Sequence, residues 1–421
     1  MKFIQQLIDN LQTKVQSQFL RNLGWLGASE IVYRVIRLAL VVVIARFLSR
    51  YDYGLGAIVM TVRELTLTFT SVGIGAKIIQ AEDEELEVLC NSAYWLNWTI
   101  FVTLFVIQCL ASLPISWFYQ TNNLILPICV SAVPYLIWPL ATIHKTLIQR
   151  GNRLKLIAVT DSIQNSFGGI LSAICAACGL GVWSFVLPSV LVAPLEVLIF
   201  CRLYDWRPNT GFTVRYWSEI FSFGKSILGV TLLKTLRNNL DYLIVGRFVG
   251  ISELGVYFFG FNAGLGLSLG IINAINSAML PHLCSARSQW SEFRHRYYNS
   301  LKIIGFIIIP LVLLQCILAP LYVPLIFGQK WVKAIPILIL ICLSAIPRPF
   351  ADTASQLLVA VGKPHLDLRW NVLFTTIFSL ALMIGIQWQI IGIATSVLVV
   401  HFIFLPIFTI WASRYVFSQK N

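Results

Sequence analysis

Charged residues interrupt apolar stretches that are otherwise long enough to cross a membrane. The stretch 23–45 carries Glu30, Arg34 and Arg37. Their spacing of i, i+4 and i+7 places them on one face of a helix, with Glu30 positioned to pair with Arg34. An ionisable group at the centre of a bilayer costs about 2.5–3.5 kcal/mol on insertion scales. Each of these groups therefore needs a partner or a function.

The same pattern recurs in three further apolar stretches. In 220–245, Lys234, Asn238 and Asp241 share a helical face, and Arg237 can reach Asp241 at i+4. The remaining charges are the adjacent Arg63 and Glu64 in 54–74, Arg348 and Asp352 at i and i+4 in 333–360, and the single acids Asp161 and Glu196. Bases and acids nearly balance, so one interpretation is that they form structural pairs between helices.

The other interpretation is a hydrated cavity between two halves of the chain, lined by these polar faces. Arginine binds phosphate through a planar fork of donors, which makes it suited to a phosphorylated ligand. The predicted binding residues are Arg34, Arg37, Arg63, Lys234, Arg237, Asn238 and Arg348. The predicted charge partners or coupling residues are Glu30, Glu64, Asp241 and Asp352.

Composition indicates an integral membrane protein. Of the 421 residues, 57% are hydrophobic and only 12% are charged, and the mean hydropathy is +0.78. Soluble domains carry about a quarter charged residues. The net charge of +13 does not indicate nucleic-acid binding, because the Lys and Arg are spread between apolar stretches rather than gathered in one patch.

Twelve stretches are long enough to span about 30 Å of hydrocarbon. They are 23–45, 54–74, 92–112, 124–146, 156–178, 182–203, 220–245, 254–280, 303–323, 333–360, 367–387 and 390–413. With the N-terminus in the cytoplasm, only Arg46, Arg50, Arg247, Lys330 and Lys333 of the loop cations fall outside. This asymmetry predicts that both termini are cytoplasmic. Residues 1–20 have an amphipathic pattern that is typical of a helix lying on the membrane surface.

An internal repeat divides the chain. ARFLSRYDYGL at 45–55 is echoed by GRFVGISELGV at 246–256, and SAVP at 131–134 is echoed by SAIP at 344–347. Both halves keep the same membrane orientation, as in the parallel repeats of many transporters. The predicted fold is all-α, with twelve transmembrane helices in two parallel six-helix repeats around a central cavity. The predicted parts are a surface helix 1–20, a bundle 21–205, a cytoplasmic linker 206–219 and a bundle 220–421.

Several kinds of chemistry lack a sequence signature. No nucleotide-binding glycine motif is present. The five His are isolated from one another, and Cys175 and Cys178 lie within an apolar stretch without a second pair. We therefore predict no catalytic residues, no metal site and no cofactor, and energy drawn from an ion gradient, the membrane potential or the gradient of the ligand itself.

The chain resembles the polysaccharide-export flippases of the Wzx type, within the superfamily that includes the multidrug and toxin extruders. The resemblance rests on GW at 24–25, ARFLSRYDYG at 45–54, GAKIIQ at 75–80, GVW at 181–183, NLDY at 239–242, GRF at 246–248, LGVY at 254–257 and FGQKW at 327–331. It implies a multi-pass protein of the plasma (inner) membrane that moves an isoprenoid-diphosphate-linked oligosaccharide to the outer leaflet by alternating access. The implied partners are that lipid-linked glycan, membrane lipids and other polysaccharide assembly proteins.

Three other functions stay open at this stage. An integral membrane glycan polymerase or ligase would need catalytic residues in a sizeable outer loop, whereas the loop 113–123 is short and nearly uncharged. A cation-coupled drug extruder of the same fold would favour unpaired acids over Arg in its cavity. A membrane scaffold would transport nothing.

Overall fold

A computed structural model describes residues 39–70, 73–151, 153–208, 211–284 and 289–418. The predicted surface helix 1–20 lies outside the described residues, as do Glu30, Arg34 and Arg37. Within the described ranges the protein is helical throughout, without a β-strand. The predicted all-α class is confirmed.

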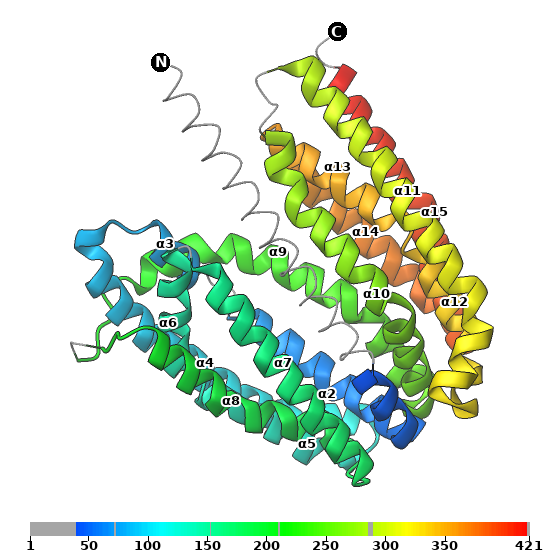
Figure 1. Cartoon of the computed structure of the whole chain (residues 1–421), viewed down its shortest axis with the longest axis horizontal. Coiled ribbons are helices and arrows are strands. Elements are labelled where there is room, and N and C mark those ends of the chain that lie inside the picture. Colours follow the sequence, from blue (N-terminus) through cyan, green and yellow to red (C-terminus); the bar gives the residue numbers. More distant parts are fainter. Residues whose placement is uncertain (1–38, 71–72, 152, 209–210, 285–288, 419–421) are drawn as a thin grey trace, which may run out of the picture.

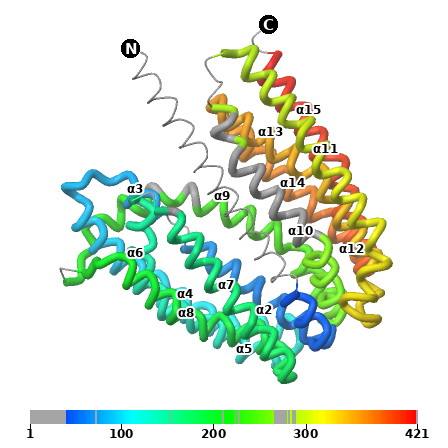
Figure 2. Tube along the Cα trace, viewed as in Figure 1, coloured from blue at the N-terminus to red at the C-terminus, as the bar shows by residue number. Residues whose placement is uncertain are grey.

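The helices form two groups that diverge from a common end, with α9 running between them (Figure 1). The first group contains a helical segment at 39–47, followed by α2 Arg50–Thr68, α3 Ile74–Gln80, α4 Asp83–Tyr119, η1 Asn122–Leu124, α5 Ile125–Ser131, η2 Val133–Leu136, α6 Pro139–Arg150, α7 Leu154–Ala177 and α8 Trp183–Leu203. The second group follows α9 Trp217–Ile244 and η3 Val245–Val249, and comprises α10 Ile251–Cys284, α11 Trp290–Tyr322, η4 Val323–Phe327, η5 Gln329–Ala334, α12 Ile335–Ser344, α13 Arg348–Ala360, α14 Pro364–Gly385, η6 Ile386–Trp388 and α15 Gln389–Ser418. The order of the segments along the chain can be followed in Figure 2.

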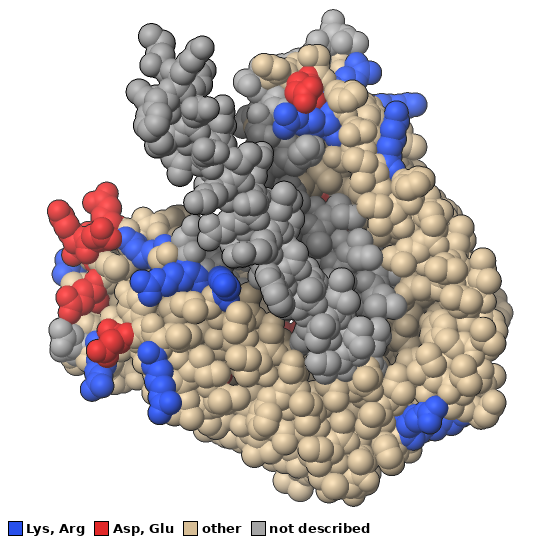
Figure 3. Space-filling view, in the orientation of Figure 1, with Lys and Arg blue, Asp and Glu red and all other residues tan. Residues whose placement is uncertain are grey.

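Length and apolar composition qualify five helical segments of the described chain as membrane spans. The number rises to six if 122–136 and 139–150, which meet at a bend of 55°, count as one span. A broad uncharged belt separates charged side chains near the ends of the molecule on the face shown in Figure 3. The protein is therefore a multi-pass membrane protein, while the count of twelve spans stays a prediction.

Proline breaks the helices at two related places. Pro134 and Pro139 flank the bend between α5 and α6, and Pro347 caps the start of α13 directly after α12 has ended. Proline lacks the amide hydrogen and clashes with the preceding turn, so a helix bends or restarts there. Pro310, by contrast, lies within the continuous helix α11.

Residues 45–50 and 325–331 lock together where the two groups meet, and we call this contact the latch. Arg46 donates from Nε to the carbonyl of Ile326 at 2.7 Å and from Nη2 to that of Leu325 at 2.9 Å. In the reverse direction, Lys330 Nζ donates to the carbonyls of Arg46 and Leu48, both at 2.7 Å. Arg46, Arg50 and Lys330 belong to the five loop cations that the sequence predicts on the outer side. In the structure, their side chains donate to backbone carbonyls of the other half of the chain.

Helix α9 belongs to both groups. Near its start, Ile220 is fully buried among residues of α3, α4 and α6, and the indole of Trp217 donates to the carbonyl of Ser92 at 3.1 Å. Near its end, Asp241 is bonded to Tyr257 of α10. The two ends of α9 are thus held by different groups of helices, while the division of the chain at residues 206–219 stays a prediction.

Candidate functional site

A cavity of about 530 Å³ lies among α2, α9, α10, α13, α14 and α15. Among the described residues, seven charged ones line it, and they are Glu64, Lys234, Arg237, Asp241, Arg348, Asp352 and Asp367. Asn238, Asn262, Asn371 and His401 add neutral polar groups, and Trp370, Phe374, Phe378 and Phe408 add aromatic rings. A cavity of this size and mixed lining is typical of a ligand site.

The side chain of Arg237 is held by residues of α14. Its Nη1 donates to Oδ1 of Asn371 at 2.7 Å, and its guanidinium carbon lies 5.5 Å from the centre of the Phe374 ring. Asn371 in turn donates from Nδ2 to the backbone carbonyl of Asp367 at 2.9 Å and to its carboxylate at 3.1 Å. The orientation of Arg237 is thus set by a chain of hydrogen bonds from another helix.

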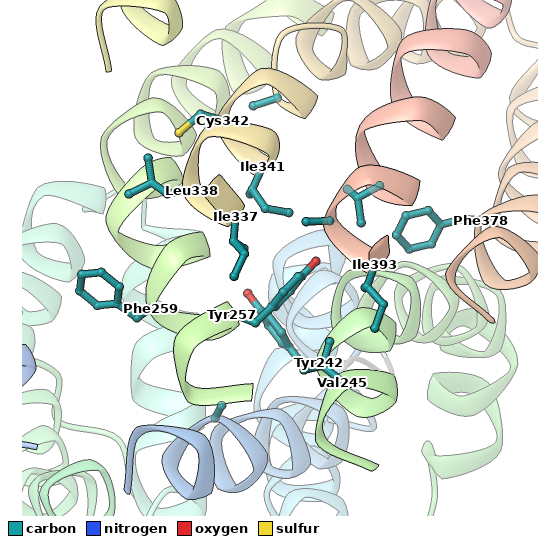
Figure 4. Packing of buried hydrophobic residues seen from close by; sticks show 14 of the residues in the cluster. Tyr242, Val245, Tyr257, Phe259, Ile337, Leu338, Ile341, Cys342, Phe378 and Ile393 are labelled. Atoms are coloured by element: carbon teal, nitrogen blue, oxygen red, sulfur yellow. The ribbon is translucent and has the colours of Figure 1, made fainter. Parts of the chain in front are cut away.

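Asp241 is bonded to α10 rather than to Arg237. It is 4% exposed, and its carboxylate accepts from the hydroxyl of Tyr257 at 2.8 Å and from the backbone N–H of Tyr242 at 3.0 Å. The two tyrosines lie side by side in the apolar core, next to Ile337 (Figure 4). The predicted Arg237–Asp241 pair is therefore wrong. Spacing along one helix shows what a side chain can reach, but neighbouring helices supply better placed partners.

Arg348 begins α13 and lines the same cavity. Its Nε is buried without a hydrogen-bond partner, and its charge interacts with those of Asp241 and Asp352. A buried donor that lacks an acceptor is costly, by about 1–3 kcal/mol, unless a ligand or water supplies one. Arg348 is therefore a candidate for contact with an oxygen-bearing ligand.

Lys234, Asn238 and Glu64 line the cavity as well, and all three are exposed. Asp352, predicted as a partner of Arg348, lies in the lining one helical turn further along α13. The structure thus brings together the predicted polar faces of 54–74, 220–245 and 333–360.

Arg63 does not line this cavity. Its guanidinium carbon lies 5.4 Å from the centre of the Trp138 ring, on the side of α2 that faces the first group of helices. Adjacent residues of a helix point about 100° apart, so Arg63 and its neighbour Glu64 cannot face the same space. Arg63 is not among the described lining residues of this cavity, and its role in binding stays a prediction.

The acids of the first group form a separate network. Lys145 of α6 bonds Asp161 of α7 at 2.9 Å and lies 3.9 Å from Glu196 of α8. These contacts tie three consecutive helices together. The interpretation as structural pairs between helices fits this network.

The second half of the chain supplies most of the cavity wall. From the first half, only Met60, Thr61 and Glu64 of α2 appear among the described lining residues. The predicted central cavity between the two halves stays a prediction, because Arg34 and Arg37 of the first half lie outside the described residues.

The wall contributed by α14 was missed by the sequence analysis. Asp367, Trp370, Asn371, Phe374 and Phe378 all line the cavity. Their spacing of i, i+3, i+4, i+7 and i+11 is the stripe of a single helical face. Polar residues at this spacing in the otherwise apolar stretch 367–387 were the signal available in the sequence.

The fold and the site define a class of protein: a helical membrane protein with a polar, charged cavity among its helices. The profile of the family described as "Polysaccharide biosynthesis protein" matches residues 43–336. The chain belongs to this family.

Similar proteins agree with that assignment. The chain is 26% identical over 320 residues to the teichuronic acid biosynthesis protein TuaB of Bacillus subtilis, covering 75% of this chain and 66% of that protein. It is 22% identical over 388 residues to the lipopolysaccharide biosynthesis protein WzxC of Escherichia coli, covering 90% and 77%. Among solved structures, the lipid II flippase MurJ in an inward closed conformation superposes with a TM-score of 0.76 at 14% identity, covering 92% of this chain and 87% of MurJ. The last similarity shows a shared fold.

Proposed function

We propose that the protein moves an isoprenoid-diphosphate-linked oligosaccharide from the cytoplasmic to the outer leaflet of the inner membrane by alternating access. It acts as a transporter and not as an enzyme. Family membership and the MurJ-like fold support this function. The observation that carries it is the convergence of Lys234, Arg237 and Arg348 on one cavity inside an apolar helical body.

These three cations suit a diphosphate. The ligand brings about two negative charges into a region with little water, where charge-assisted hydrogen bonds are strong. Arg237 and Arg348 present forked donors from α9 and α13. Arg34 and Arg37, which lie outside the described residues, are proposed to add further cations from the first half, with Glu30 as their counter-charge.

The proposed architecture is twelve spans in two parallel repeats, with both termini in the cytoplasm. The paired motifs 45–55 and 246–256 support it, because they lie at the starts of α2 and α10, which cross each other. The proposed bundles are 21–205 and 220–421, joined by 206–219, with α9 shared between them. Labelling a cysteine placed at Ser418, in an otherwise Cys-free chain, tests the orientation. Reaction from outside intact cells would contradict it.

Purified protein in proteoliposomes tests the transport function. A fluorescent isoprenyl-diphosphate-linked glycan should cross the bilayer faster than in protein-free vesicles, and Arg237→Gln should abolish the difference. In cells, deletion of the gene should leave lipid-linked glycan on the cytoplasmic leaflet. An unchanged leaflet distribution in both systems would refute the proposal.

One observation favours a second function. The described cavity lining holds four acids, Glu64, Asp241, Asp352 and Asp367, against three bases. A cation-coupled extruder of the same fold would use such acids to bind a cationic drug. Export of a fluorescent organic cation by the proteoliposomes, without movement of the lipid-linked glycan, would favour this alternative.

A further inference from the structure

The cavity wall formed by α14 has a composition that phosphate binding does not explain. Asp367, Trp370 and Asn371 face the cavity together with Phe374. On the other sides of the same helix, Leu368, Val372 and Leu373 are 42%, 48% and 50% exposed. The helix therefore turns an apolar surface outward and keeps a face of acid, indole and amide for the cavity.

The side chains of this face are held in place before any ligand arrives. The indole of Trp370 stacks on the ring of Phe408, with centroids 4.9 Å apart and an interplanar angle of 12°. Asn371 is held between Arg237 and Asp367 by hydrogen bonds of 2.7 and 3.1 Å. Preorganised groups of this kind lose little freedom when they bind a ligand.

Two buried donors in the cavity residues lack acceptors. They are Nε1 of Trp370 and Nε of Arg348. Both need an oxygen atom, and buried polar groups are otherwise almost always hydrogen-bonded. One donor belongs to a cation and the other to a neutral side chain, so the cavity residues differ in the charge of the oxygen atom that suits them.

The charges near Asp367 and Arg237 limit which group can bind at the α14 wall. The carboxylate of Asp367 would repel a phosphate but accepts hydrogen bonds from hydroxyl groups. Arg237, bonded to the same wall through Asn371, would repel an organic cation. A neutral, hydroxyl-rich group with an apolar face is the ligand that acid, amide and indole can bind together.

We infer that the α14 face of Asp367, Trp370 and Asn371 is a carbohydrate subsite, which binds the sugar attached directly to the diphosphate. The inference rests on the proposed function, and it assigns the residues that contact the glycan part of the ligand. Asn371 joins the subsite to Arg237, so the first sugar and the diphosphate occupy neighbouring positions. A cavity of about 530 Å³ accommodates this portion of the ligand rather than a long glycan.

Binding measurements with two kinds of probe test the inference. The probes are farnesyl diphosphate and a panel of farnesyl diphosphates carrying glucose, galactose or N-acetylglucosamine, titrated by calorimetry into the full chain in nanodiscs. The wild-type protein should bind at least one sugar-bearing probe about tenfold more tightly than farnesyl diphosphate. Trp370→Phe, which keeps an aromatic ring but removes the N–H donor, and Asp367→Asn should each remove most of this advantage. Trp370→Phe should bind farnesyl diphosphate within about twofold of wild type. Asp367→Asn also alters the hydrogen bonds that orient Arg237, so it should lose more affinity for the sugar-bearing probe than for farnesyl diphosphate.

A matched control is Trp388→Phe, because Trp388 is 64% exposed and does not line this cavity. It should leave every affinity unchanged. If no sugar increases affinity, or if the α14 variants weaken both kinds of probe equally, the carbohydrate subsite is wrong while the diphosphate site stands. If the wild-type protein binds none of the probes, both the proposed function and the carbohydrate subsite are wrong.

Discussion

Gly54 of α2 and Gly255 of α10 lie against each other's helices in a reciprocal contact. A Cβ on Gly54 would overlap the carbonyl oxygen of Ile251, and a Cβ on Gly255 would overlap that of Arg50. Each glycine stands at the same position of the repeated motif, as do Arg50 and Ile251. The two copies of the motif therefore pack against one another at their glycines, and only glycine permits this approach.

Gly54→Ala and Gly255→Ala should each destabilise the protein by about 1–3 kcal/mol, because the helices must separate to admit a methyl group against backbone. Thermal unfolding in detergent measures the effect. Gly229→Ala is the matched control, since nothing lies within 4 Å of a Cβ at this position of α9. It should leave stability unchanged or raise it slightly. Wild-type melting temperatures for both motif variants would show that the close contact is absent in the membrane.

Loss of the latch should open the end of the molecule at which the two motifs meet. Arg46→Gln cannot make the two hydrogen bonds to the carbonyls of Leu325 and Ile326, so the buried residues Ala45 and Leu48 should become accessible. A cysteine at Leu48, which is 2% exposed, should react with a membrane-impermeant maleimide faster in this variant than in the parent Cys-free chain. Arg46→Lys should give an intermediate rate, because an ammonium lacks the planar fork. Equal labelling rates in the parent chain, Arg46→Gln and Arg46→Lys would show that the latch does not keep this end of the molecule closed.

Arg237→Gln should lower transport of lipid-linked glycan more than about tenfold, because it removes one of the three cations that line the cavity among the described residues. Arg237→Lys should recover only part of the activity, since a single ammonium cannot hold Asn371 and a diphosphate in the same fixed geometry. Initial rates in proteoliposomes, corrected for the amount of reconstituted protein, measure both. The control is Lys225→Gln, an exposed cation of the same helix that does not line the cavity. Transport at the wild-type rate by Arg237→Gln would place the ligand elsewhere.

Tyr257→Phe should destabilise the protein by about 1–3 kcal/mol, because the buried carboxylate of Asp241 loses the hydrogen bond that the Tyr257 hydroxyl donates to it. A double-mutant cycle with Asp241→Asn isolates the contribution of this pair. Additive losses in thermal stability would mean that the hydroxyl and the carboxylate do not interact.

The sequence alone was sufficient for the class of protein and for many of the polar residues. Apolar stretches of span length require helices, because backbone groups in hydrocarbon must bond within their own segment. Charges inside such stretches are expensive wherever they lie, so Lys234, Arg237, Arg348 and Asp352 stand out before any contact is known. The repeat of Arg-Phe and Gly also indicated two related halves.

The tertiary structure decided which of these charges share a space. Helical periodicity relates residues within one helix, but it does not place one helix against another. Arg63 and Glu64 are neighbours in sequence, and the packing of α2 between two groups of helices sends them to different surroundings. Asp241 and Arg237 were within reach of each other, and Tyr257 and Asn371 from other helices bind them instead. The α14 wall could be recognised only from the tertiary structure, which places it beside α9. The sequence shows that α14 has a polar face, but it does not show that this face lies opposite Arg237.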